Sequence, residues 1–128
     1  MKKWFIGFVA MLALFTLAAC STVEEKEDDG YATIQIDEVT QKMEDGYIVL
    51  DVREVSEFAE GHIPGALNKP LSGLQANDFS ELSKDEKYVI ICRSGNRSQT
   101  ASDILQEEGY SIVNVAQGMS SWTGHVAK

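Results

Sequence analysis

The sequence predicts an α/β fold in which helices cover both faces of a central, mostly parallel sheet of five strands. Strand-like and helix-like segments alternate along residues 31–128, a pattern typical of parallel sheets with helical crossovers. Residues 47–51 and 87–92 are nearly continuous apolar runs, as expected of strands that are buried on both faces. The 98 residues from 31 to 128 are enough to form one small domain with its own core.

Five segments are expected to be strands: 32–36, 47–51, 66–68, 87–92 and 111–115. The first alternates between apolar and polar residues, which indicates a half-buried strand. The fourth is the clearest central strand, because its apolar run is the most continuous and ends directly at a cysteine.

Four segments are expected to be helical: 37–44, 55–60, a single turn within 71–86, and 98–108. Asp37 is the expected N-cap of the first. Glycines follow the first, second and fourth segments at Gly46, Gly61 and Gly109, and glycine is the usual residue just past a helix end. A short segment around Trp122 closes the chain.

The first nineteen residues are expected to be an export signal. Lys2 and Lys3 precede an apolar run over residues 4–19, which is shorter than the ~20 residues that a membrane-spanning helix needs. The run ends in two alanines and Cys20, and a cysteine at this point resembles the lipobox of bacterial lipoproteins. The resemblance implies that residues 1–19 are removed and that Cys20 carries lipid. A plain signal peptide or a marginal transmembrane anchor is the alternative.

Residues 20–30 are expected to be a lipid-anchored, acidic tether. Residues 21–30 contain five acids and one lysine, and so little apolar surface cannot repay the entropy of ordering. The globular domain would then occupy residues 31–128. The protein would be exported and held by its lipid at the outer face of the bacterial cell membrane, or at the periplasmic membrane face.

Charge and cysteine usage narrow the function of the domain. Residues 31–128 carry fifteen acids and eight bases, a formal charge of −7, which excludes nucleic acid as the expected partner because phosphate binding needs a basic face. The chain has two cysteines. If Cys20 is lipidated, Cys92 has no partner within the chain, and an unpaired cysteine in an exported domain indicates a reactive thiol or an intermolecular bond.

A loop of small and cationic residues joins the clearest strand to the longest expected helix. Ligands of open α/β sheets bind at the carboxyl ends of strands, so Cys92 is expected at the binding edge. Gly95 and Asn96 both tolerate positive φ, so the loop can turn its N–H groups inward. Inward N–H groups at a helix N-terminus bind anions and favour a thiolate. The candidate anion-binding residues are Arg93, Ser94, Gly95, Asn96 and Arg97.

The arginines gather near the same edge. The chain has three, Arg53, Arg93 and Arg97, against eight lysines. Two lie in the loop, and Arg53 follows Asp51 at the end of the other apolar strand. Arginine is suited to bidentate capture of oxyanions. A local basic cradle on an acidic domain would guide an anionic substrate to this one place.

Three separated motifs resemble those of rhodaneses, a family of sulfurtransferases. Residues 92–98 (CRSGNRS) are similar to the family's active-site loop, and residues 51–54 (DVRE) with 57–66 (EFAEGHIPGA) are similar to its upstream signature. The resemblance spans about residues 31–122. It implies a single rhodanese-like domain in which Cys92 accepts a sulfane sulfur as a persulfide and hands it on. The implied partners are a small anionic donor such as thiosulfate and a thiol or cyanide acceptor.

The chain departs from the family's pattern near its end. Rhodaneses often carry two consecutive glycines before the final aromatic segment, where this chain has Gln117 and Gly118. Only six residues follow Trp122, so the last helix is expected to be short. No metal and no cofactor is expected, and a monomer is the default.

The residues around the loop are assigned different parts. Arg93 is the preferred substrate contact. Two roles are considered equally for Arg97: it contacts the substrate, or its guanidinium binds loop carbonyls or an acid. Asp51 is expected to support the loop or to pair with an arginine. Arg53 and Ser98 are likewise placed behind the residues that touch substrate.

The two histidines are not assigned to catalysis. His62 lies in a Gly-His-Ile-Pro-Gly turn, where the glycines and the proline indicate a structural part. Sulfur transfer between anionic sulfur atoms also has less need of a proton shuttle than acyl transfer has. His125 lies in the tail and is expected to be uninvolved.

Three other interpretations of Cys92 stay open. Phosphatases and arsenate reductases of the Cys-x5-Arg type encircle a tetrahedral oxyanion, whereas four residues separate Cys92 from Arg97 here, so this loop is expected to suit one sulfur atom better than phosphate. A module that carries sulfur or senses sulfide without turnover would use the same thiol. A buried structural cysteine is the third possibility, which the neighbouring arginines and glycine disfavour.

Overall fold

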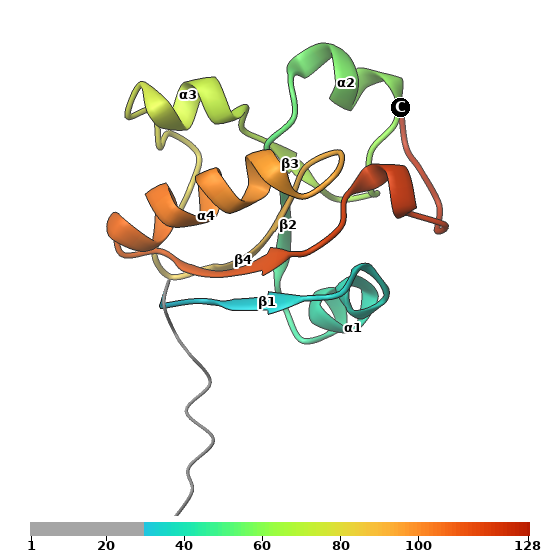
Figure 1. The fold of residues 1–128 in the computed structure, drawn as a ribbon, viewed down its shortest axis with the longest axis horizontal. Coiled ribbons are helices and arrows are strands. Elements are labelled where there is room, and N and C mark those ends of the chain that lie inside the picture. Colours follow the sequence, from blue (N-terminus) through green and yellow to red (C-terminus); the bar gives the residue numbers. More distant parts are fainter. Residues whose placement is uncertain (1–29) are drawn as a thin grey trace, which may run out of the picture.

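The structure is a computed structural model that describes residues 30–128 (Figure 1). The expected export signal, the lipid attachment at Cys20 and nearly all of the acidic tether lie outside the described residues. Within residues 30–128 no helix is long and apolar enough to span a membrane.

The five strands form one sheet in the order β1-β5-β4-β2-β3, and every neighbouring pair is parallel. The α/β fold with a five-stranded sheet is therefore confirmed. Strand β4 is central, with Val89 opposite Val49 of β2 and Val113 of β5. The strand bounds are β1 Ala32–Ile34, β2 Ile48–Asp51, β3 Leu67–Asn68, β4 Lys87–Ile91 and β5 Ser111–Val115.

Helices cover both faces of the sheet, as predicted (Figure 1). Helices α3 and α4 pack on one face and α1 on the other, while α2 buries no residue completely and follows the carboxyl end of β2. The helices are α1 Val39–Glu44, α2 Val55–Glu60, α3 Leu71–Gln75 and α4 Asn96–Glu107, with 3-10 helices η1 Ile36–Glu38 and η2 Met119–Ser121.

The alternation of β4 divides the core into two clusters. Tyr88 and Ile90 face α3 and α4, whereas Val89 and Ile91 face α1. All four side chains are at most 1% exposed, which is the burial expected of a central parallel strand. Cys92 continues the alternation and belongs to the α3–α4 cluster, so the thiol sits at the rim of a closed core.

Several element boundaries differ from the sequence-based expectation. Strand β1 ends at Ile34, because Gln35 opens a 3-10 turn and its N–H donates to the Glu38 carboxylate at 2.6 Å. Gln35, and not Asp37, therefore occupies the N-cap position. Helix α4 begins at Asn96, two residues earlier than expected, since Gly95 takes the positive φ and Asn96 is already helical.

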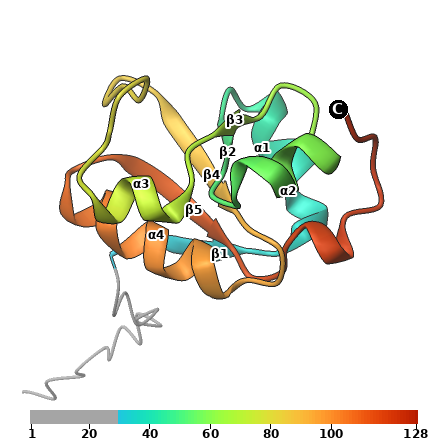
Figure 2. The same ribbon diagram turned by 90° about the horizontal axis from the view of Figure 1, so that it is seen from above.

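The C-terminal segment returns to the carboxyl edge of the sheet. Both views place the chain end beside α2 (Figures 1 and 2). His62 and Ala127 pair there in an antiparallel bridge, with N–H···O distances of 3.0 and 2.8 Å. The final helix is the three-residue η2, short as expected, and it lies next to the loop that follows β4.

Candidate active site

Cys92 is the first residue after β4 and stands at the carboxyl edge of the sheet. It is a free thiol and only 1% of its surface is exposed. The backbone just before it is held firmly, because Val52 N–H donates to Ile91 C=O at 2.9 Å and joins the ends of β2 and β4. The sheet thus fixes the thiol at the edge where α/β folds bind ligands.

The loop after Cys92 curls back over the sulfur. Gly95 adopts φ 104°, and its N–H donates to Cys92 Sγ at 3.1 Å. A side chain at Gly95 would overlap the carbonyl oxygen of Ala116. Glycine is therefore required here for two reasons, the left-handed backbone and the close approach of β5's end.

The loop favours the thiolate form of Cys92. Burial raises the pKa of the thiol, but hydrogen bonds from the Ser98 hydroxyl and from the backbone N–H of Ser98 outweigh this, together with those of Gly95 and Ser94. The net result is a pKa below the usual value for cysteine. The twelve-residue α4 starts within this loop and has no acid in its first turn, so its N-terminal dipole adds to the same effect.

Ser98 is fully buried beneath the loop. Its hydroxyl lies 3.1 Å from Gly95 C=O and 3.4 Å from Val115 C=O, as well as beside the sulfur. A hydroxyl has one proton, so it donates to one of these acceptors at a time. Ser98 both supports the curl of the loop and offers a proton to a developing thiolate.

Arg53 and Asp51 form a buried pair at the end of β2. The guanidinium approaches Asp51 with N···O distances of 2.7 to 3.1 Å and also donates to Gly61 C=O at 2.8 Å. The two side chains are 8% and 1% exposed. Asp51 also accepts from the Arg53 N–H at 3.0 Å. Arg53 reaches the same edge as the loop, but its charge is already neutralised.

Arg97 pairs with Glu57 of α2. Two hydrogen bonds of 2.6 and 3.0 Å make the pair bidentate. The hydrogen bonds to Arg97 hold the pKa of Glu57 at about 2, although partial burial acts in the opposite direction. Of the two parts considered for Arg97, the structure places it on an acid. The pair fastens α2 to the start of α4.

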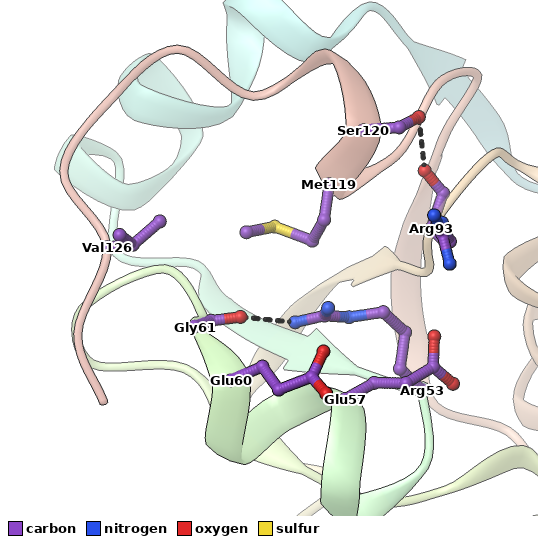
Figure 3. A pocket seen from close by; sticks show the side chains of 8 residues that line it. All are labelled: Arg53, Glu57, Glu60, Gly61, Arg93, Met119, Ser120 and Val126. Atoms are coloured by element: carbon purple, nitrogen blue, oxygen red, sulfur yellow. Dashed lines mark hydrogen bonds between the residues drawn. The ribbon is translucent and has the colours of Figure 1, made fainter.

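Arg93 is the arginine of this site without an ion pair among residues 30–128. Its side chain is exposed and lines a pocket of about 330 Å³ together with Arg53 (Figure 3). Its backbone is fixed, because Ser120 donates to Arg93 C=O through both its N–H at 3.0 Å and its hydroxyl at 2.8 Å. The residue that follows the thiol therefore has a fixed backbone and an uncompensated guanidinium, which is suited to an anionic ligand.

The pocket lies beside the loop and is closed by three parts of the chain (Figure 3). Helix α2 supplies one side, η2 a second, and the C-terminal segment a third. Cys92 itself does not line it, so Arg93 is the link between the pocket and the thiol. The lining residues are Arg53, Glu57, Glu60, Gly61, Arg93, Met119, Ser120 and Val126.

Residues 117–120 clamp the loop, a part that the sequence reasoning missed. Met119 N–H donates to Cys92 C=O at 2.8 Å, and a side chain at Gly118 would overlap the backbone of Arg93. Gly118 therefore keeps the small size that this contact needs. Gln117 stands where rhodaneses often have a second glycine. Its side-chain oxygen accepts from Ile36 N–H at 2.8 Å, and its side-chain nitrogen donates to the Gln35 side-chain oxygen at 2.6 Å. The glutamine that replaces this glycine therefore connects the segment to η1 by hydrogen bonds.

Two further contributors were also missed. Asn68 donates to Asp51 C=O at 3.0 Å and to Arg53 C=O at 2.9 Å, which holds the turn after β2. Glu57 forms the pair with Arg97. Its signals in the sequence were its place at the start of the 57–66 motif and in the first turn of α2. His62 stacks on Phe58 with ring centroids 3.6 Å apart, a packing contact. Within residues 30–128 no cluster of metal-ligating side chains occurs.

Comparisons with known proteins agree on one family. The rhodanese-like domain family matches residues 35–125. The candidate sulfurtransferase YtwF of Bacillus subtilis is 43% identical over 68 residues, which are 53% of this chain and 65% of that protein. A sulfurtransferase of Allochromatium vinosum is 39% identical over 71 residues, 55% of this chain and 65% of its own length.

A second curated relative from Bacillus subtilis, the candidate sulfur carrier protein YrkF, is 36% identical over 69 residues, 53% of this chain and 37% of its own length. The chain thus spans less than two thirds of these relatives. Among solved structures, a rhodanese-related protein of Thermoplasma volcanium superposes with a TM-score of 0.70 at 36% identity. That likeness covers 76% of this chain and 98% of the other.

Proposed function

This chain belongs to the rhodanese-like domain family, and we propose that it is a sulfurtransferase that moves a sulfane sulfur through a persulfide on Cys92. The donor is a small sulfur oxyanion such as thiosulfate, and the acceptor is a thiol or cyanide. The observation that carries the proposal is the thiolate-stabilising loop, in which Gly95 N–H donates to Cys92 Sγ at 3.1 Å. The loop also carries Arg93, whose guanidinium forms no ion pair within residues 30–128.

In the first half-reaction the Cys92 thiolate attacks the outer sulfur of thiosulfate. A new S–S bond forms to Sγ, the S–S bond of thiosulfate breaks, and sulfite leaves with the electron pair. Arg93 holds the oxygens of the donor, which develop more charge as sulfite departs. The loop N–H groups stay in place to stabilise the anionic persulfide that remains.

In the second half-reaction the acceptor attacks the outer sulfur of the persulfide. The bond from Sγ to the outer sulfur breaks, and its electron pair returns to Cys92 as the thiolate. Cyanide leaves as thiocyanate, and a thiolate leaves as its persulfide. The same loop stabilises the thiolate before and after turnover, so no proton needs to move at Cys92.

The geometry favours sulfur transfer over phosphate ester hydrolysis. Arg97 occupies the last position of the loop, and its two hydrogen bonds go to Glu57 at 2.6 and 3.0 Å. A phosphatase would need that guanidinium on its oxyanion. Only four residues lie between Cys92 and Arg97, which leaves a curl sized for one sulfur atom.

A non-turnover sulfur carrier is a second candidate, favoured by the 36% identity to a protein named as a candidate sulfur carrier. A carrier would form the same persulfide on Cys92 but would release it to small acceptors no faster than the uncatalysed reaction does. The rate at which the Cys92 persulfide passes its sulfur to small acceptors therefore distinguishes the two functions, whereas formation of the persulfide does not.

The test uses residues 31–128, which contain both core clusters and every strand pairing. With thiosulfate the protein is expected to gain about 32 Da, the mass of one persulfide sulfur, and to lose it to cyanide as thiocyanate. Cys92→Ala is expected to show neither. Equal thiocyanate production by the two proteins would overturn the proposal, loading without catalysed release would favour the carrier, and rapid cleavage of an aryl phosphate would favour a phosphatase.

We further propose that the mature protein begins at a lipidated Cys20 and is held at the outer face of the cell membrane. Support comes from the apolar run that ends in two alanines and this cysteine. Mass spectrometry of the detergent-extracted full-length product is expected to give an acylated N-terminus at Cys20. A mature protein that starts at any other residue would contradict the lipid anchor.

A further inference from the structure

The pocket beside Arg93 is larger than the proposed donor requires. Thiosulfate and cyanide are ions of only a few atoms, whereas the pocket encloses about 330 Å³. That volume lies at the lower end of the range for pockets that bind small organic ligands. The extra room extends from Arg93 towards α2 and the C-terminal segment (Figure 3), so it is available to the carbon skeleton of an acceptor.

Two of the four charged side chains that line the pocket are already neutralised. Arg53 is paired with Asp51 at 2.7 Å, and Glu57 is paired with Arg97 at 2.6 Å. Arg93 and Glu60 are left, and neither forms an ion pair among residues 30–128. Figure 3 shows them on opposite sides of the pocket. The uncompensated charges are therefore one cation, on the residue that follows Cys92 in the chain, and one anion, at the end of α2.

Two apolar side chains also line the pocket. Met119 extends from η2 into the pocket, and Val126 faces it from the C-terminal segment (Figure 3). Val126 is 55% exposed, yet its backbone is fixed by the bridge between His62 and Ala127. Trp122 Nε1–H donates to His125 C=O at 2.9 Å and holds the preceding turn. The apolar wall is thus built into the fold.

We propose that the acceptor is a small zwitterionic aminothiol, a thiol of the amino-acid type. Its carboxylate would meet Arg93, its ammonium group would meet Glu60, and its hydrocarbon would lie against Met119 and Val126. The inference rests on the proposed sulfur transfer and adds to it the chemical class of the acceptor. A neutral thiol or a thiol with a single charge satisfies only part of this arrangement.

The transfer step balances without any further reagent. The acceptor thiol loses its proton to solvent, and its thiolate attacks the outer sulfur of the Cys92 persulfide. The bond between that sulfur and Sγ breaks, and Cys92 leaves as a thiolate. The aminothiol departs as its own persulfide.

The experiment isolates this second step. Residues 31–128 are loaded with thiosulfate, freed of excess donor, and mixed with cysteine, cysteine methyl ester or N-acetylcysteine at equal thiolate concentrations. The ester lacks the carboxylate and the acetylated compound lacks the ammonium group. Cysteine is expected to discharge the persulfide faster than either analogue.

Glu60→Gln is expected to lower the rate with cysteine and with its ester roughly two- to fivefold, the range for an exposed ion pair. The rate with N-acetylcysteine is expected not to fall, because that compound has no ammonium group to lose. The matched control Glu107→Gln removes an exposed carboxylate at the end of α4 and is expected to leave the preference for cysteine intact. Added salt is expected to reduce the preference, since Glu60 is exposed.

Equal rates for the three thiols, or a cysteine preference that Glu60→Gln does not change, would overturn the aminothiol proposal. The first result would point to a macromolecular acceptor that contacts more than this pocket. Failure of the proposed function gives a different signal, because no persulfide would then form on Cys92 at the loading step.

Discussion

Two neighbouring strands, β2 and β4, end side by side at the carboxyl edge, and the charged residues at the two strand ends differ in whether they are paired. Asp51, the last residue of β2, neutralises Arg53 two residues later, and both side chains are buried. Cys92 is the first residue after β4, and the next residue, Arg93, is exposed and forms no ion pair with any acid of residues 30–128. The charges at the end of β2 neutralise each other, whereas the loop after β4 leaves the Arg93 guanidinium and the Cys92 thiol available.

The difference teaches that charge pairing, more than residue type, decides which arginine can bind substrate. All three arginines reach the same edge of the sheet. Arg53 and Arg97 each form an ion pair with a carboxylate, at 2.7 and 2.6 Å. These two arginines therefore stabilise the backbone around the thiol. The following variants test this division, from the largest expected effect to the smallest.

Asp51→Ala is expected to destabilise the domain most, by about 3–5 kcal/mol, because it leaves the buried guanidinium of Arg53 without a partner. Urea denaturation of residues 31–128 measures the change. The double variant Asp51→Ala with Arg53→Met removes both charges and is expected to recover much of the loss. If Asp51→Ala lowered the free energy of unfolding by less than about 1 kcal/mol, the Asp51–Arg53 pair would not stabilise this edge of the domain.

Arg93→Gln is expected to leave the free energy of unfolding within about 0.5 kcal/mol of wild type, as for most exposed positions. The specificity constant for thiosulfate should fall about ten- to a hundredfold, since a charge-assisted hydrogen bond to the donor is lost. Lys42→Gln on α1 is the control for loss of a positive charge elsewhere. Unchanged kinetics in Arg93→Gln would remove this residue from the donor site.

Ser98→Ala is expected to raise the pKa of Cys92, because the hydroxyl that favours the thiolate is removed. The rising limb of persulfide formation against pH should move to higher pH, and stability should fall by about 1 kcal/mol. Thiolate absorbance gives the titration directly. Ser102→Ala, an equally buried serine of α4 bonded to Asn114, should lose stability without moving the limb; a shift in both variants would contradict the assignment.

Glu57→Gln is expected to have the smallest effect, a loss of about 1 kcal/mol or less at neutral pH, because the Arg97 pair is partly exposed. The folded-state pKa of Glu57 is lowered to about 2 from 4.5, so the pair contributes fully above about pH 4.5 and its contribution disappears as pH falls towards 2. Glu60→Gln on the same helix should cost no stability. A difference that persisted unchanged at pH 2 would argue against an ionic pair.

Much of the fold was predictable because it depends on local patterns. The apolar run before Cys92 and the alternation of helices and strands were enough to predict a mostly parallel five-stranded sheet, its covered faces and the place of the thiol. Boundaries were less predictable. The start of α4 depended on which of Gly95 and Asn96 took the positive φ. Contact with Ala116, the residue just after β5, made Gly95 the residue that could not be replaced.

The sequence by itself determined that a cysteine, two arginines and a glycine follow a central strand, and hence the kind of chemistry to expect. Only the tertiary structure decided which charges cancel. The pairing of Arg97 with Glu57 joins residues 40 positions apart, and the hydrogen bond from Met119 to Cys92 joins residues 27 positions apart. Such contacts depend on how α2, η2 and the C-terminal segment pack around one edge, and no local periodicity encodes that packing.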